Sequence, residues 1–370
     1  MISEIDKHFM RLALREARKA LGRTSPNPCV GSVVVKDGEV LGKGYHKKAG
    51  TPHAEIHALR QAAAKSRGAT LYVTLEPCSH TGRTPPCCEA VAASGVVRVV
   101  IGMEDPNPLV QGAGARYLLE KGISVTTGVL EPICRKLNRP FIKYITSGLP
   151  WVIMKAGLSL DGKITYQGRK TGGMTGRESL AAVHRLRDRC DAIMVGIGTV
   201  VSDDPSLTTR LPGRKKGKDP IRVVLDTGLS IPEHARILLQ QSAAPTLVFC
   251  GPDADAEKAA RLVNNGTVIC RVQKDAGGGV DLTLVLRELG RRGITSLLVE
   301  GGARLHGAML KHCLYDYAYL FYAPLFAGDQ GLSFLSGYDS AGGDTAFRLT
   351  EVLTRRYGTD LLISGCLDYR

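Results

Sequence analysis

The first half of the chain alternates between two hydrophobic periodicities. Apolar side chains recur at helical spacing over residues 5–21, whereas residues 30–35 and 40–45 are apolar runs that flank the turn at residues 36–39. Two such runs joined by a short turn predict a β-hairpin. Helices and strands then alternate, beginning with a helix, at residues 54–66, 69–75, 87–94, 96–103, 114–121 and 124–127. This order predicts a sheet with helices on both faces.

The pattern starts again in the second half. The predicted segments are a strand, a loop, a helix and a strand at residues 151–156, 158–173, 178–189 and 192–196, followed by apolar runs at residues 221–226, 246–250 and 296–299. Alternation of this kind favours a second α/β unit with a largely parallel sheet. Because 370 residues exceed what one core usually holds, we expect two domains, residues 1–147 and 148–370.

Composition narrows the classes of function. No apolar run approaches the roughly 20 residues of a membrane helix, and the amphipathic start does not resemble a signal peptide, so we expect a cytoplasmic protein. The ten cysteines are scattered, which favours metal binding or burial over disulfides. The net charge of +14, with only 5% aromatic residues, favours small anions as ligands over nucleic acid.

One constellation predicts a metal site. His53 and Glu55 are followed by Cys78 and, nine positions later, by Cys87. A catalytic zinc takes three protein ligands and leaves one position for water, which the metal acidifies. Single histidines and cysteines are more often ordinary buried residues, so the joint occurrence carries the prediction. Cys88 adjoins Cys87, and spacing alone does not choose between them, although Cys87 follows two prolines and should open a helix.

These residues resemble the cytidine deaminase-like zinc enzymes. The eight residues between the two cysteines, together with residues 27–31, 44–46 and 105–108, resemble the branch that acts in riboflavin synthesis. The resemblance implies zinc ligands at His53, Cys78 and Cys87, with Glu55 as the proton shuttle. The substrate contacts that it implies are Asn27, His46, His80, Arg83 and Thr84.

The second half carries weaker motifs of its own. Glycines follow predicted strands at residues 196–198 and 301–302, where the backbone could approach a phosphate. Residues 155–163, 203–208 and 300–302, with Thr199 and Arg210, resemble the pyrimidine reductase domain, which is related to dihydrofolate reductase. The resemblance implies NADPH as the hydride donor.

The same resemblance implies particular contacts. Those to the cofactor would be Gly157, Gly173, Thr199, Asp203, Gly302, Ala303 and Arg304. Those to the substrate would be Thr171, Arg187, Leu207, Arg210 and Glu300. Lys155 and Asp161 are candidates for orienting the opened sugar or relaying a proton; a buried ion pair and an exposed loop charge are the alternatives. Gly173 stands where the family commonly has tryptophan, so a stacking surface for the cofactor is missing there.

Together the halves resemble the bifunctional deaminase–reductase family of riboflavin biosynthesis. We therefore expect an N-terminal cytidine deaminase-like zinc domain, which deaminates a diaminopyrimidinone ribosyl phosphate. A C-terminal dihydrofolate reductase-like domain then uses NADPH to reduce the ribosyl group to ribityl. The expected partner is a small phosphorylated pyrimidine, with no nucleic acid and no membrane, and the enzyme is expected to be a homo-oligomer.

Two alternatives differ in class. One is a nucleic-acid base deaminase of the tRNA type, with the second half as a binding module. The other is a non-enzymatic protein with a structural zinc, for which Cys88 or His57 would supply a fourth ligand.

Overall fold

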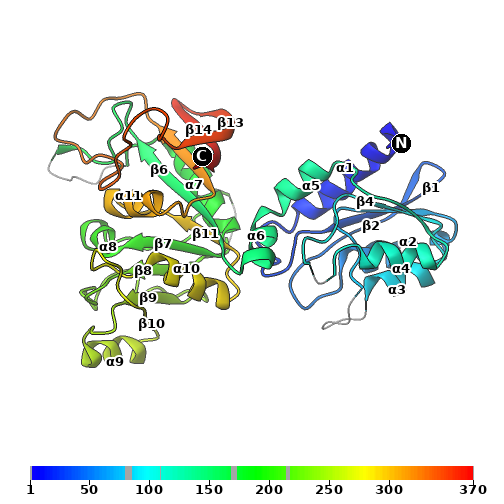
Figure 1. The fold of residues 1–370 in the computed structure, drawn as a ribbon, viewed down its shortest axis with the longest axis horizontal. Coiled ribbons are helices and arrows are strands. Elements are labelled where there is room, and N and C mark those ends of the chain that lie inside the picture. The colour runs from blue at the N-terminus through cyan, green and yellow to red at the C-terminus, as the bar shows by residue number, and fades with distance from the viewer. Residues whose placement is uncertain (1, 80–85, 109, 168–172, 214–216, 370) are drawn as a thin grey trace. The chain divides into compact units, whose positions relative to one another are not determined.

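The computed structural model describes residues 2–79, 86–108, 110–167, 173–213 and 217–369. The chain divides into two compact units, Met1–Gly148 and Leu149–Arg370, and Figure 1 shows the elements of each. The described residues include no helix that is both long and apolar enough to cross a membrane.

The first unit is built on a five-stranded sheet in the order β2-β1-β3-β4-β5. Its strands are β1 (Gly31–Lys36), β2 (Glu39–Tyr45), β3 (Thr70–Val73), β4 (Arg98–Ile101) and β5 (Ser124–Thr126). Its helices are α1 (Glu4–Arg18), α2 (Ala54–Ala62), η1 (Ala63–Ser66), α3 (Cys87–Ala93), α4 (Ala113–Glu120), α5 (Glu131–Leu137) and α6 (Arg139–Ser147). The predicted hairpin is present as β1 and β2, and β3, β4 and β5 are parallel.

Helices cover both faces of this sheet, as the sequence predicts. In Figure 1, α1 and α5 lie on one face, whereas α2, α3 and α4 lie on the other. Gly44 of β2 permits a close approach, because an added Cβ would lie 2.2 Å from the carbonyl oxygen of Ala54. The absence of a side chain at Gly44 therefore lets the first turn of α2 rest directly on the hairpin.

The second unit holds a nine-stranded sheet in the order β10-β9-β8-β7-β11-β6-β12-β14-β13. Its strands are β6 (Trp151–Leu158), β7 (Ala192–Gly196), β8 (Ile221–Leu225), β9 (Thr246–Cys250), β10 (Val268–Arg271), β11 (Ser296–Val299), β12 (Tyr317–Tyr322), β13 (Arg348–Tyr357) and β14 (Asp360–Asp368). Its helices are α7 (Arg177–Arg189), α8 (Ile197–Asp203), α9 (Ala256–Asn264), α10 (Leu282–Arg291) and α11 (Ala303–Lys311). The strands from β10 to β12 are parallel, whereas β14 is antiparallel to both neighbours.

Apolar clusters cover both faces of the second sheet. Side chains of α10 and α11 pack with Val152 and Met194 on one face, and side chains of α8 and α9 pack with Ile193 and Leu298 on the other. Because β6, β7 and β11 are adjacent and parallel, their carboxyl ends meet at one edge of the sheet. Such an edge is where open α/β sheets bind their ligands.

Candidate functional site

Three donors converge in the first unit. His53 is the N-cap residue of α2, Cys87 is the first residue of α3, and Cys78 lies in the segment that follows β3. Their ligand atoms all lie within 4.8 Å of one another. His53 Nδ1 is 3.0 Å from Cys87 Sγ and 3.6 Å from Cys78 Sγ. One imidazole and two thiolates at this separation could hold a zinc ion and leave its fourth position open.

Electrostatics favour an anionic sulfur within this group. The hydrogen bond from Cys87 lowers the pKa of Cys78, and the contact with His53 acts in the same direction. The main-chain N–H of Cys87 donates to Cys78 Sγ at 3.3 Å. A thiolate is the form of cysteine that binds metals, so the site is prepared for a cation.

Glu55 lies in the first turn of α2, two residues after His53. It is only 3% exposed, and burial raises the pKa of its carboxyl group to about 7. A carboxyl group that titrates near neutrality can both accept and donate a proton at physiological pH. Glu55 is thus a buried proton donor and acceptor close to the metal group.

Two of the predicted substrate contacts lie beside the metal group. Asn27 Nδ2 is 3.1 Å from His46 Nε2, and the ring of His46 stands edge-on to that of His53 at 5.2 Å between centroids. Burial lowers the pKa of His46, which favours its neutral form. The other candidates in this half, His80, Arg83 and Thr84, lie outside the described residues.

The structure separates Cys88 from the metal group. Cys88 is 1% exposed and belongs to the apolar core of the first unit. Within the described part of the chain, the metal group contains neither Cys88 nor His57. The preference for Cys87 over its neighbour therefore agrees with the geometry.

Two supporting residues escaped the sequence analysis. Asn138 clamps the peptide of Cys29, accepting from its N–H at 2.8 Å and donating to its carbonyl oxygen at 3.1 Å. Glu76 accepts three main-chain N–H groups from the segment between β4 and α4 and from the first turn of α4. The residues that Asn138 and Glu76 contact lie far from them in the sequence, so no local pattern could have identified Asn138 and Glu76.

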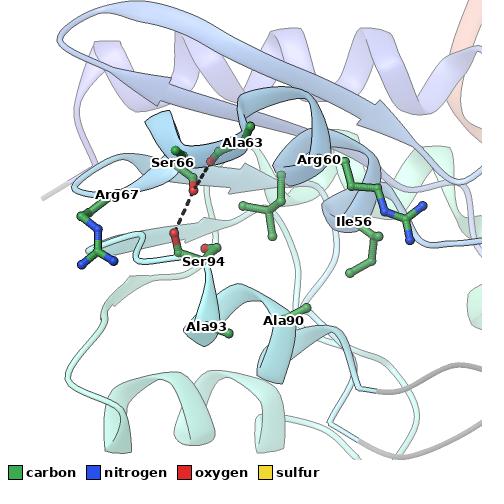
Figure 2. A pocket seen from close by; sticks show the side chains of 10 residues that line it. Ile56, Arg60, Ala63, Ser66, Arg67, Ala90, Ala93 and Ser94 are labelled. Atoms are coloured by element: carbon green, nitrogen blue, oxygen red, sulfur yellow. Dashed lines mark hydrogen bonds between the residues drawn. The ribbon is translucent and has the colours of Figure 1, made fainter.

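A groove between α2 and α3 lies apart from these residues. It has a volume of about 510 Å³, and Figure 2 shows Arg60 and Arg67 at its rim. Ser66 Oγ lies 2.8 Å from the carbonyl oxygens of Ala63 and Ser94. None of the candidate site residues that the structure describes lines this groove.

A buried charge cluster marks the second unit. Glu300 follows β11, and its carboxylate accepts from Arg187 Nε at 2.7 Å and Arg187 Nη2 at 3.0 Å. Lys155 Nζ, on the adjacent strand β6, lies 3.3 Å from the same carboxylate. Burial alone would raise the pKa of Glu300, but the charges of Arg187 and Lys155 outweigh it and lower the pKa to about 2. The structure thus brings together Lys155, Arg187 and Glu300, which the sequence analysis gave as separate candidates.

Among the remaining candidates of the second unit, Gly157 lies near the carboxyl end of β6, Thr199 follows β7, and Gly302 follows β11. Thr199 lies in α8, with its hydroxyl 3.7 Å from the position that a Cβ on Gly302 would take. A Cβ on Gly157 would meet Thr175 at 3.3 Å. The others are Asp203 at the end of α8, buried Leu207 and exposed Arg210 in the segment after α8, buried Ala303 and exposed Arg304 in α11, and exposed Gly173. Thr171 lies outside the described residues.

Asp161 has a structural role in the second unit. Its carboxylate accepts the main-chain N–H groups of Ala327 and Gly328 at 3.0 and 2.8 Å. The pKa of Asp161 is lowered to about 2, and the hydrogen bond from Ser159 has the largest effect. Asp161 therefore anchors the loop after β12.

Comparisons with known proteins assign both units to enzyme classes. A family model described as the cytidine and deoxycytidylate deaminase zinc-binding region matches residues 3–103. A second, described as the RibD C-terminal domain, matches residues 150–363. The class is that of a zinc-dependent deaminase joined to a reductase.

Relatives of known name extend over nearly the whole chain. The riboflavin biosynthesis protein RibD of Aquifex aeolicus is 44% identical over 333 residues, which cover 90% of each chain. That of Escherichia coli strain K12 is 38% identical and covers 97% of this chain and 98% of its own. The solved structure of Acinetobacter baumannii RibD superposes with a TM-score of 0.88 at 34% identity, covering 99% of each chain. The chain belongs to the RibD family.

The expectations about class are thereby confirmed. The protein is a bifunctional deaminase and reductase of riboflavin biosynthesis that acts on a small pyrimidine, and zinc and NADPH are its cofactors. The predicted fold, a cytidine deaminase-like domain followed by a reductase domain, is also confirmed. A nucleic-acid base deaminase is not favoured.

Proposed function

We propose that residues 1–147 carry the deaminase and residues 148–370 the reductase, and that both act on a phosphoribosylaminopyrimidine. A Thermotoga maritima relative of known structure, 36% identical, with a TM-score of 0.85 and 99% of each chain covered, is named a diaminohydroxyphosphoribosylaminopyrimidine deaminase and 5-amino-6-(5-phosphoribosylamino)uracil reductase. The observation that carries the proposal is the three-donor metal group beside a buried glutamate.

In the deaminase, His53, Cys78 and Cys87 would hold the zinc ion. Bound zinc would lower the pKa of a water molecule and so supply the nucleophile for the ring carbon that bears the amino group. Glu55 takes a proton from that water and delivers it to the leaving nitrogen, so that ammonia departs and a carbonyl group remains. Asn27 and His46 bind the pyrimidine edge, since an amide side chain can both donate and accept.

Contacts to the phosphoribosyl group complete the deaminase proposal. We assign them to His80, Arg83 and Thr84, whose segment joins the two cysteine ligands in sequence. Of these three, Arg83 has the planar set of donors that suits a phosphate group.

In the reductase, bound NADPH would supply the hydride for sugar carbon C1 of the ring-opened ribosyl group, the reduction that converts ribosyl to ribityl. We assign the cofactor contacts to Gly157, Gly173, Thr199, Asp203, Gly302, Ala303 and Arg304. The substrate contacts are assigned to Thr171, Arg187, Leu207, Arg210 and Glu300. Arg210 is exposed, so its guanidinium group is available for the phosphate.

The contacts within the buried charge cluster support different roles for its members. Arg187 uses three of its N–H groups on Glu300 and on the carbonyl oxygen of Thr208, so its main task is to hold Glu300 ionised. Lys155 Nζ, beside the same carboxylate, is placed to orient the sugar hydroxyl groups and to supply the proton that accompanies the hydride. Asp161 anchors a loop and is not assigned to the chemistry.

The test uses the two activities of one chain. Ammonia release and NADPH oxidation are followed together for the wild type and for Glu55→Gln, with zinc content measured in both. Glu55→Gln should lose deamination by about 10²- to 10⁴-fold, keep its zinc, and reduce the deaminated pyrimidine at the wild-type rate. Normal ammonia release by this variant would remove Glu55 from the mechanism.

We further propose a cytoplasmic homo-oligomer that binds neither nucleic acid nor membrane. None of the ten cysteines, all of which lie in the described part of the chain, forms a disulfide, as expected for a reducing compartment. Light scattering coupled to size-exclusion chromatography measures the oligomeric state.

A further inference from the structure

His184 is a buried imidazole of α7 that the proposed mechanism does not use. It is 4% exposed, and its Nδ1 lies 3.2 Å from the main-chain nitrogen of Arg210. A main-chain N–H can only donate, so Nδ1 must carry a lone pair, and the ring is neutral with its hydrogen on Nε2. Burial, followed by the charges of Arg187 and Arg210, lowers the pKa of His184 to about 4. The imidazole is therefore an acceptor throughout the neutral pH range.

The segment that leads to this contact contains two residues with strained backbone. Asp204 has a φ of +40° and Leu207 a φ of +50°. Both lie in the left-handed region of backbone conformation, which residues other than glycine rarely adopt. Such conformations persist only where the surrounding structure holds them. The segment that runs from the end of α8 to Arg210 therefore needs external support.

One face of α7 supplies that support. His184 accepts from the Arg210 N–H, and one turn later Arg187 Nη1 donates to the carbonyl oxygen of Thr208 at 3.2 Å. The next residue, Asp188, accepts from the main-chain N–H of Lys218 at 2.8 Å. Residues three and four positions apart lie on the same helix face, so this face of α7 binds the main chain at Thr208, Arg210 and Lys218.

We infer that His184 is a positioning residue of the reductase, which fixes the backbone of Arg210 and thereby directs that guanidinium group at the substrate phosphate. The inference rests on the proposed function, in which Arg210 binds the phosphate. Arg187 is largely committed to Glu300 and Thr208, and Lys155 faces Glu300. Arg210 is exposed, and while Asp219 accepts from the N–H of Thr209, His184 accepts from that of Arg210 itself.

The experiment is a double-mutant cycle on the full-length, zinc-loaded enzyme. Wild type, His184→Phe, Arg210→Ala and the double variant are assayed for reduction of 5-amino-6-(5-phosphoribosylamino)uracil, with KM for this substrate, KM for NADPH and kcat determined separately. His184→Asn is the rescue variant, because its side-chain oxygen can take the place of Nδ1. His234→Phe is the matched control, since His234 is an exposed histidine of the same unit. Ammonia release by the same chains reports on the first unit.

We expect His184→Phe to raise the KM for the pyrimidine roughly three- to tenfold, the equivalent of one lost hydrogen bond. KM for NADPH and ammonia release should not change, and His184→Asn should restore most of the affinity. On the Arg210→Ala background, His184→Phe should add little further effect, because its influence passes through Arg210.

Three results would overturn the inference. An equal effect of His184→Phe with and without Arg210 would show that the imidazole does not act through the arginine. A parallel rise in both KM values, unrelieved by His184→Asn, would reveal a general structural role. Arg210→Ala with wild-type KM would remove Arg210 from the proposed function itself, and the inference would fall with it. The first two results leave the proposed function intact.

Discussion

Glu76 links the metal-binding segment to the segment between β4 and α4, and its replacement should loosen the first unit. It is 4% exposed. Its Oε2 accepts the N–H groups of Asp105 and Gly112 at 3.1 and 3.0 Å, and its Oε1 accepts that of Ala115 at 3.0 Å. Two residues further along lies Cys78, so this carboxylate ties a metal ligand to the start of α4.

Glu76→Gln keeps the size of the side chain but replaces one accepting oxygen by an NH₂ group. The amide oxygen can satisfy the pair of donors at Asp105 and Gly112, which leaves the N–H of Ala115 facing another donor. A buried donor without a partner costs about 1–3 kcal/mol, and the two remaining bonds lose the strength that a charged acceptor provides. We therefore expect the free energy of unfolding of the first unit to fall by about 2–4 kcal/mol.

The assay must separate the two units. The single tryptophan, Trp151, belongs to the second unit, so its fluorescence in urea monitors that unit. Zinc release to a coloured chelator and loss of ammonia production monitor the first. Glu76→Gln should release zinc at lower urea concentration than the wild type, with the tryptophan transition unchanged.

Glu104→Gln is the matched control for this prediction. Glu104 precedes Asp105, is exposed, and contacts the Gln111 side chain at 3.2 Å. Surface changes of this kind usually alter stability by less than about 0.5 kcal/mol. The reasoning is refuted if the two glutamine variants release zinc at the same urea concentration.

Three further predictions concern the first unit. Burial alone would raise the pKa of Asp6, but bonds from Arg98 and Ser3 lower it from 3.8 to about 2. Asp6→Asn should therefore cost about 2 kcal/mol above pH 4 and progressively less as the pH falls toward 2, in urea titrations at several pH values. Removal of zinc by a chelator should abolish ammonia release and leave NADPH oxidation with the deaminated pyrimidine intact; loss of both would contradict separate sites. Gly44→Ala should reduce ammonia release and leave NADPH oxidation unchanged, because the added Cβ would lie 2.2 Å from the Ala54 carbonyl oxygen and displace α2. An unchanged rate of ammonia release would show that α2 can shift at no cost.

The sequence alone determined the elements and the metal chemistry of the first unit. The predicted hairpin at residues 30–35 and 40–45 is present as Gly31–Lys36 and Glu39–Tyr45. The metal donors were predicted from the joint occurrence of His53, Cys78 and Cys87 and from the family resemblance that these residues carry. Local pattern could not choose between Cys87 and Cys88; packing decided that, since Cys88 lies in the apolar core.

Only the tertiary structure decided which residues support the sites. Arg187 meets Glu300 across 113 residues, and Asn138 meets Cys29 across 109. Such pairs depend on strand order and on which helix face meets a loop, and periodicity records neither. A hydrophobic pattern indicates which face of a helix or strand is buried. Which other element covers that face depends on the packing of the whole unit. For this reason Glu76 and His184 became visible only in the folded chain.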